Sequence, residues 1–185
     1  KNLACGSFGD ISTFSFYANK HITTGEGGMI FTNNSKLYKK FISYRNLSFG
    51  KKNRFNHEDI SWNYRFTNIQ ASLGLSQLKR IKSIIKKKRE IGKFYYENFK
   101  NNKKIIIQPQ QNNFAQNIYW VFGILLKKNN DNYRRFIQSQ LLRKGIETRR
   151  FFWPMHKQKI FQKMNIFKKQ KFPNSEYLSK NGFYI

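Results

Sequence analysis

The spacing of apolar and polar positions divides the first half of the chain into short strands and helices. Residues 11–18 (ISTFSFYA) combine β-branched and aromatic residues and predict a strand, and residues 29–33 predict a second strand after the turn TTGEGG. Residues 35–47 begin at a serine suited to cap a helix and continue with apolar residues at helical spacing. Residues 67–99, behind a capping threonine, give the strongest helical signal of the chain.

Two glycines, Gly74 and Gly92, fall inside this long helical segment and lower its intrinsic helix propensity. We interpret the first of them as a point where another element packs closely against the helix. The preceding residues 48–64 are polar and aromatic without a sustained period, and they predict a loop.

The second half of the chain alternates between the two kinds of element. It predicts strands at 105–108, 118–127 and 146–153, and helices at 132–145, 158–165 and 174–181. Gly145 is placed to end the first of these helices. The pattern as a whole predicts an α/β protein in which the long helix bridges a first sheet region and a second, smaller one.

Length and composition support a packed core and limit the classes of protein. The chain has 185 residues, of which 39% are hydrophobic and 17% aromatic, so it is not of the disordered class. Its longest apolar runs are too short to span a bilayer, and we expect no membrane partner. The first ten residues lack the apolar core of a secretory leader, and there is one cysteine, so we expect a cytoplasmic location.

The formal net charge of +27 supports two interpretations. One is a basic module that binds nucleic acid or another polyanion. The other is a compositional preference for lysine on the surface, and three features favour it. The lysines are dispersed, with a longest pure run of three at 86–88; arginine is in the minority; and no common nucleic-acid motif is present. We therefore predict no specific nucleic-acid partner.

Lys20 has the neighbours of a reactive amine, because it follows a strand and precedes the glycine-rich turn GEGG. Partial desolvation at such a place disfavours the ammonium form, and the resulting neutral amine can form a Schiff base. The glycines permit positive φ and close approach of the backbone to a ligand. Spacing alone leaves a solvated surface lysine as the commoner outcome. Three histidines and one cysteine show no metal-ligand spacing, so no metal site is predicted.

Three ordered blocks resemble one enzyme family. Residues 9–34, which contain SFYANKHITTGEGG, resemble the lysine region of the DegT/DnrJ/EryC1/StrS aminotransferases. Residues 62–81 are similar to the Asn-Tyr-Arg block that leads into that family's long helix. Residues 145–161 resemble its C-terminal substrate-side block, in wording closest to the perosamine synthase branch. The resemblance implies a partial fold type I aminotransferase dependent on pyridoxal 5'-phosphate, with the second half of the large domain and the small C-terminal domain.

The resemblance also implies a role for individual residues. Lys20 would carry the Schiff base with pyridoxal phosphate and move the proton during catalysis, and Ser15 would bind the cofactor phosphate. Asn63 would reach the phosphate in the neighbouring subunit of a homodimer with shared active sites. Arg149 and His156 would lie on the side of the nucleotide-sugar substrate. Glutamate would donate the amino group to a 4-keto nucleotide sugar for surface polysaccharide.

Each of these residues also has a structural interpretation that the sequence leaves open. Ser15 would face a neighbouring backbone group, and Asn63 would cap the loop before the long helix. Arg149 would be an exposed strand residue, and His156 would be a loop residue bonded to the backbone.

Compared with that family, the chain lacks the preceding half of the large domain, which supplies the contacts to the pyridine ring. We expect residues 1–90 to form the remaining half of the large domain, with the start of the long helix, and residues 91–185 to form the small domain. Two hypotheses rival an enzyme: a truncated non-catalytic remnant of the family, and a basic nucleic-acid-binding module. The reading frame upstream would discriminate the first, and a salt titration of DNA binding the second.

Overall fold

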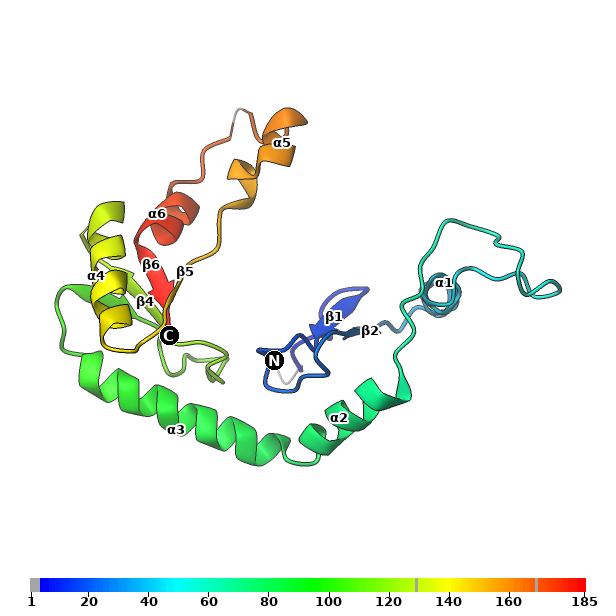
Figure 1. Cartoon of the computed structure of the whole chain (residues 1–185), viewed down its shortest axis with the longest axis horizontal. Helices are drawn as coiled ribbons and strands as arrows, with labels where there is room; N and C mark the ends of the chain where they lie inside the picture. Colours follow the sequence, from blue (N-terminus) through cyan, green and yellow to red (C-terminus); the bar gives the residue numbers. More distant parts are fainter. Residues whose placement is uncertain (1–3, 129, 169) are drawn as a thin grey trace. The chain divides into compact units, whose positions relative to one another are not determined.

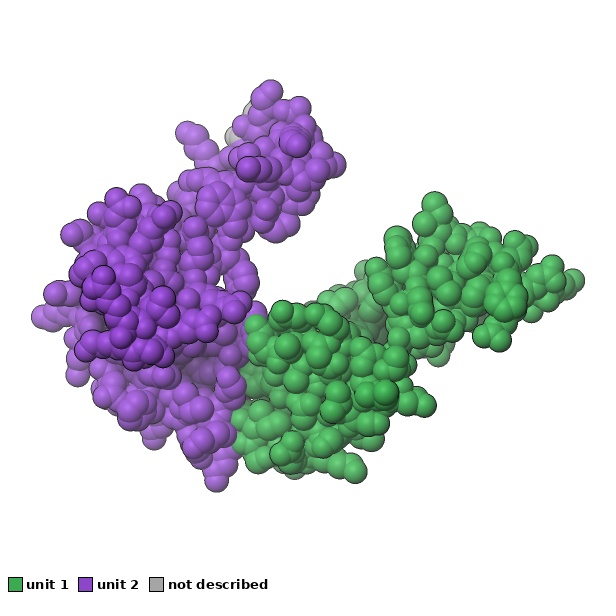
Figure 2. All heavy atoms as spheres, in the orientation of Figure 1, with its two compact units in different colours: residues 1–85 green, residues 86–185 purple. Residues whose placement is uncertain are grey.

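A computed structural model describes residues 4–128, 130–168 and 170–185 of the chain. The chain divides into two compact units, Lys1–Ile85 and Lys86–Ile185 (Figure 2). The division falls inside a helix, whereas the sequence analysis places the domain boundary after residue 90 of that helix. Within the described ranges, no helix has both the length and the apolar character needed to cross a bilayer.

The first unit opens with a two-stranded antiparallel sheet (Figure 1). Strand β1 (Ser12–Ser15) pairs with β2 (Gly28–Phe31), so that Ser15 lies opposite Gly28. An edge-to-face contact between Phe14 and Phe31, with ring centroids 5.0 Å apart, joins the two strands on one face. Both predicted strands are confirmed. β1 is shorter than its predicted run because pairing stops where the connecting loop begins, and β2 begins one residue before and ends two residues before its predicted run.

Helix α1 (Ser35–Arg45) confirms the predicted helix but not its predicted cap. Asn34 is the N-cap, because its side-chain oxygen accepts bonds from the backbone N–H groups of Lys36 and Leu37. Ser35 is instead the first helical residue. Asparagine caps as well as serine does, so the sequence alone could not separate the two neighbours.

The predicted helix at 67–99 is wrong as a single element, because it consists of α2 (Asn68–Leu78) and α3 (Ile81–Phe99). Thr67 caps α2 in a capping box with Gln70, as the sequence predicts for this threonine. At the break, the backbone N–H of Arg80 bonds to the carbonyl of Gln77 at 2.9 Å, a tighter turn than the α-helix allows. Neither proline nor glycine marks this point in the sequence, and the apolar spacing continues across it. The sequence therefore contains no signal of the break.

The first unit leaves much apolar surface open to solvent. Neither α1 nor α2 buries a residue. Large hydrophobic side chains are exposed on both strands and on α2, and they are Phe14, Met29, Ile30, Phe31, Ile69, Leu73, Leu75 and Leu78. Exposed apolar surface on this scale is typical of a face that packs against other protein.

The second unit contains a four-stranded antiparallel sheet in the order β3-β4-β6-β5. Its strands are β3 (Ile105–Ile107), β4 (Gly123–Leu126), β5 (Arg149–Arg150) and β6 (Gly182–Tyr184). Strand β6 was not predicted from the sequence, although it pairs with β4 on one side and β5 on the other. Its three residues are too few to show a period of their own.

The core of the second unit is aromatic and aliphatic. Its buried members are Tyr119, Phe122, Ile124, Leu126 and Phe183. Helix α3 contributes Tyr95 and Phe99 to this core, and α4 (Asp131–Arg143) contributes Tyr133, Ile137 and Leu141. The predicted helix at 132–145 is confirmed, with Gly145 beyond its end at φ 77°. The short helices α5 (Lys159–Lys163) and α6 (Pro173–Asn181) confirm the two predicted near the C-terminus, and η1 (Met155–Lys157) precedes them.

A buried arginine ties α4 to α6. Arg134 is 3% exposed, and its Nε donates to the carbonyl of Lys180 at 2.9 Å. Its Nη2 donates to Oδ1 of Asp131 at 2.6 Å, and Oδ2 of Asp131 accepts a bond from Arg135. These bonds, led by that from Arg134, hold the pKa of Asp131 below its ordinary value. The buried guanidinium therefore depends on an ionised carboxylate at the first turn of the helix.

We predict that Asp131→Asn lowers the free energy of unfolding at neutral pH by about 1–3 kcal/mol, because a buried charge loses its counter-ion. A depressed folded-state pKa gives stability that is present above the unfolded aspartate value, near about 4, and lost as the pH falls through the folded value. Urea unfolding of wild type and variant should therefore converge in acid. Glu147→Gln is the control. It removes the exposed ion pair between Glu147 and Arg149, whose charged atoms are 3.7 Å apart, and it should change the free energy of unfolding little. A pH-independent loss would contradict the ion-pair explanation.

We predict that Gly92→Ala destabilises the second unit despite the better helix propensity of alanine. A Cβ at this buried position would lie 2.3–2.5 Å from three ring atoms of Tyr119. Overpacking of this kind costs about 1–3 kcal/mol, against a propensity gain of about 1 kcal/mol, so we expect a net loss. Thermal unfolding followed by circular dichroism measures it. Ser83→Ala, at an exposed position of the same helix, should stay within about 0.5 kcal/mol of wild type.

Candidate functional site

The segment between β1 and β2 carries Lys20 on a loop that is closed at its base by backbone bonds. The N–H of Phe16 donates to the carbonyl of Gly27, and the N–H of Thr24 donates to the carbonyl of Phe16, both at 2.9 Å. The N–H of Lys20 donates to the carbonyl of Tyr17 at 3.0 Å and forms a turn inside the loop. Lys20 is half-buried, unlike the exposed residues 17–19 before it.

Two glycines of the turn TTGEGG adopt positive φ, as their sequence pattern predicts. Gly25 has φ 79° and Gly27 has φ 140°, values that residues with a side chain rarely adopt. At Gly27 a Cβ would also lie 2.5 Å from the ring of Phe66. The glycines thus let the chain return to β2 beside an aromatic side chain.

Ser15 is the last residue of β1 and is exposed. Its Oγ accepts a hydrogen bond from the backbone N–H of Tyr17 at 3.3 Å. That bond uses the oxygen as an acceptor, and the hydroxyl hydrogen can still donate to an anion. A hydroxyl and a lysine therefore lie on the same strand-to-turn segment, five positions apart in sequence.

Helix α2 holds the base of this loop, and the sequence analysis did not identify the residues that do so. The side-chain amide of Gln77 bonds to both main-chain groups of Thr23. Gln70 donates from Nε2 to the carbonyl of Glu26 at 3.2 Å. A Cβ on Gly74 would lie 2.9 Å from Cγ2 of Thr24, so the predicted close approach at this glycine is confirmed. The available signal was the spacing of Gln70, Gly74 and Gln77 at i, i+4 and i+7, which places them on one face of the helix.

Asn63 lies in the irregular segment between α1 and α2, where it forms an isolated bridge with Asn46. Its Oδ1 accepts a bond from Nε of Arg65 at 2.8 Å, and the residue is exposed. Trp62 and Tyr64, on either side of it, stack with ring centroids 5.9 Å apart. The exposed amide and the exposed pair of stacked rings form a surface suited to another molecule.

The two residues predicted on the substrate side both lie in the second unit, in different surroundings. The side chain of Arg149 is 70% exposed, and its nearest acidic partner, Glu147, is 3.7 Å away. Its neighbour Arg150 points its guanidinium to the carbonyl and hydroxyl of Ser179, each at 3.3 Å, and over the ring of Trp153. Of these two arginines, Arg149 is therefore the one whose guanidinium can turn to a ligand.

His156 is 12% exposed, and its Nε2 lies 3.1 Å from Oε1 of Glu176. Lys157 binds the other oxygen of that carboxylate at 2.6 Å. The bonds from Lys157, and then from His156, lower the pKa of Glu176. The ring of His156 also packs against Phe172, with centroids 4.7 Å apart. This side chain is held in place by α6 rather than by the backbone of its own loop.

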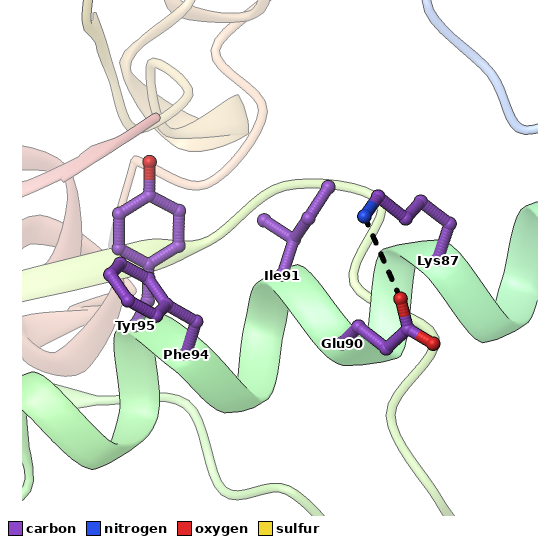
Figure 3. Close-up of a pocket in the computed structure, with 5 residues that line it drawn as sticks. All are labelled: Lys87, Glu90, Ile91, Phe94 and Tyr95. Carbon is purple, nitrogen blue, oxygen red and sulfur yellow. Dashed lines mark ion pairs between the residues drawn. The ribbon is translucent and has the colours of Figure 1, made fainter.

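A shallow hollow on α3 contains none of the predicted site residues. It is lined by Lys87, Glu90, Ile91, Phe94 and Tyr95, which come from successive turns of the helix (Figure 3). Lys87 and Glu90 form an ion pair at 3.6 Å. Among the described residues, no three histidine, cysteine or acidic side chains lie together as the ligands of a metal ion would.

Known proteins resemble this chain in sequence and in structure. The GDP-perosamine synthase of Escherichia coli O157:H7 is 37% identical over 185 residues, which are 100% of this chain and 48% of that protein. Helicobacter pylori PseC, an aminotransferase involved in the biosynthesis of pseudaminic acid, superposes with a TM-score of 0.87 at 28% identity, over 100% of this chain and 49% of that one.

A putative sugar aminotransferase of Streptococcus pneumoniae, Spr1654, in its PLP-form, shares the fold, with a TM-score of 0.85 at 21% identity over 100% of this chain and 48% of that one. The chain spans about half the length of the relatives it matches. The predicted partial α/β aminotransferase fold is thereby confirmed. All 185 residues match one family, and the chain belongs to the DegT/DnrJ/EryC1/StrS aminotransferase family.

Proposed function

We propose that this chain is the lysine-bearing part of a pyridoxal-phosphate-dependent aminotransferase that transfers an amino group from glutamate to a 4-keto nucleotide sugar. The observation that carries the proposal is the half-buried Lys20 on a closed loop, in a chain that matches a sugar aminotransferase family over its whole length. The likeness to GDP-perosamine synthase favours a perosamine-type product for surface polysaccharide, made in the cytoplasm.

The residues present suit the chemistry of pyridoxal phosphate. An amine is needed to bond its aldehyde, and Lys20 is the half-buried candidate. A hydroxyl is needed near its phosphate, and Ser15 offers one at the end of β1. Bound pyridoxal phosphate supplies an electron sink for the substrate's Cα–H bond. The protein's part is then to hold the amine and the phosphate and to move the proton.

Lys20 would have two tasks in this reaction. Its Nζ would hold the aldehyde of the cofactor in the resting enzyme, and as a free amine it would take the proton from the Cα of the amino donor and deliver it to the cofactor. Both tasks need the same short reach, so the loop that carries Lys20 must hold it in one place. The bonds at Phe16 and Thr24 supply that restraint.

Asn63 would complete the phosphate site of a second copy of the chain. Its exposure and the stacked rings beside it suit a surface that meets a partner. The exposed apolar side chains of the first unit also favour contact with a partner. Arg149 and His156 would act on the nucleotide-sugar side. Arg149 would contact the diphosphate directly, and His156 would act through its bond to Glu176.

A non-catalytic remnant of the family is the second candidate, favoured by the exposed apolar face of the first unit. It differs from the enzyme in one property that can be measured directly. A remnant has no reason to keep a selectively reactive Lys20, whereas the enzyme requires one.

We predict that Lys20→Ala abolishes a borohydride-reducible link between pyridoxal phosphate and the chain at this position. The amine is the only group that the variant removes, and no other side chain of the loop forms such a link. Absorbance spectra and peptide mass spectrometry after borohydride treatment measure the link. Lys39→Ala, at an exposed position of α1, is the matched control and should label as wild type does. Selective labelling of another lysine in wild type would overturn the assignment, and labelling spread evenly would favour the remnant.

We predict that Arg149→Ala weakens binding of a nucleoside-diphosphate sugar by about tenfold or more without lowering stability, because one charged hydrogen bond is lost. Isothermal titration calorimetry and thermal unfolding measure the two effects. Arg150→Ala is the contrasting variant and should lower stability instead, because Arg150 bonds to Ser179. Unchanged affinity in Arg149→Ala would place the diphosphate elsewhere.

A further inference from the structure

We propose that Gln77 is a positioning residue for Lys20, an inference that rests on the proposed role of Lys20 in binding the cofactor. Gln77 lies on α2, far from Lys20 in sequence, and touches neither the aldehyde nor the phosphate in the proposed scheme. It acts through Thr23, at the base of the loop.

The contact is a paired hydrogen bond between a side chain and a main chain. Oε1 of Gln77 accepts from the N–H of Thr23 at 3.0 Å, and Nε2 of Gln77 donates to the carbonyl of Thr23 at 2.7 Å. The same Nε2 donates to the carbonyl of Leu73 at 3.1 Å, within its own helix. The amide is therefore held by α2 while it holds the loop, and the pair joins positions 54 residues apart in sequence.

Thr23 passes this restraint to the other side of the loop. Its hydroxyl donates to the carbonyl of Phe16 at 3.1 Å, and the N–H of Thr24 donates to that same carbonyl at 2.9 Å. The end of β1 and the returning chain are thus joined on both sides of Lys20. Because Lys20 precedes Thr23 by three residues, its Cα stays within about 11 Å of the anchored residue.

Two further residues of α2 make this a helix face dedicated to the loop. Gln70 donates to the carbonyl of Glu26, and Gly74 lets Thr24 approach. Gln70, Gly74 and Gln77 recur at the spacing of one helix face. Thr24, which packs there, is 4% exposed. The two bonds to Thr23 are partly buried, whereas the bond from Gln70 to Glu26 is exposed.

A primary amide suits this place because it both donates and accepts in one plane. A carboxylate would accept from the N–H of Thr23 and repel the carbonyl, and an amine would do the reverse. In a chain with 26 lysine residues, cofactor selectivity for one amine requires that amine to be held where the cofactor binds. Gln77 supplies that restraint from outside the loop.

The test compares Gln77→Met with wild type on the full chain. Methionine keeps the length and most of the volume of glutamine and removes both bonds to Thr23, so folding should survive. We expect the amide hydrogen of Thr23 to exchange about tenfold or more faster, since the bond that it donates to Oε1 of Gln77 is gone. We expect the share of borohydride-trapped pyridoxal phosphate found on Lys20, relative to other lysines, to fall several-fold.

Gln77→Glu provides a graded second variant, because its carboxylate keeps the acceptor and loses the donor; we expect an intermediate loss of selectivity. Ser72→Ala is the control on the same helix, since the hydroxyl of Ser72 bonds to the carbonyl of Asn68 within the helix. Circular dichroism confirms that the helices persist in each variant.

The outcomes separate this inference from the proposed function. Even labelling of wild-type lysines would overturn the role of Lys20, and the inference with it. Selective labelling of Lys20 in wild type that is unchanged in Gln77→Met, with Thr23 equally protected, would overturn the positioning role of Gln77 alone.

Discussion

The main-chain groups of Thr23 lie outside both strands, and the side-chain amide of Gln77 satisfies them together. A backbone N–H and carbonyl that leave a sheet must find partners, or the segment pays in stability. Here the partners come from a helix that the chain reaches only after α1 and a long irregular segment. The loop that presents Lys20 is therefore held both by its own backbone bonds and by α2. Contacts from α2 reach the loop at Thr23 and, in the glycine turn, at Glu26.

The two units differ in how much of their apolar surface they bury within themselves. The second unit encloses an aromatic core, pairs four strands and ties α4 to α6 through Arg134. The first unit has a two-stranded sheet with exposed apolar side chains on both strands. A two-stranded sheet is marginal by itself in water. The proposed catalytic residue, Lys20, lies in the unit with the more exposed apolar surface.

The predicted site residues differ in exposure and in the partners that their side chains bind. Arg149 is exposed and pairs with the exposed Glu147 at 3.7 Å, whereas Arg150 beside it is bound to Ser179. His156 is held by Glu176 across a helix. Two adjacent arginines are alike in sequence and serve different ends, because strand geometry sends successive side chains to opposite faces. Composition alone, with its +27 charge, does not make this distinction.

Sequence alone determined the elements whose signals are local. The strands β1 and β2, the helix α4 with Gly145 beyond it, the cap at Thr67 and the lysine block follow from residues close together in the chain, because capping, turn chemistry and periodicity are short-range effects. Tertiary structure decided the rest. The break between α2 and α3, the insertion of β6 between β4 and β5, and the grip of Gln77 on Thr23 depend on partners far away in sequence, and no local pattern records which distant group will satisfy a hydrogen bond.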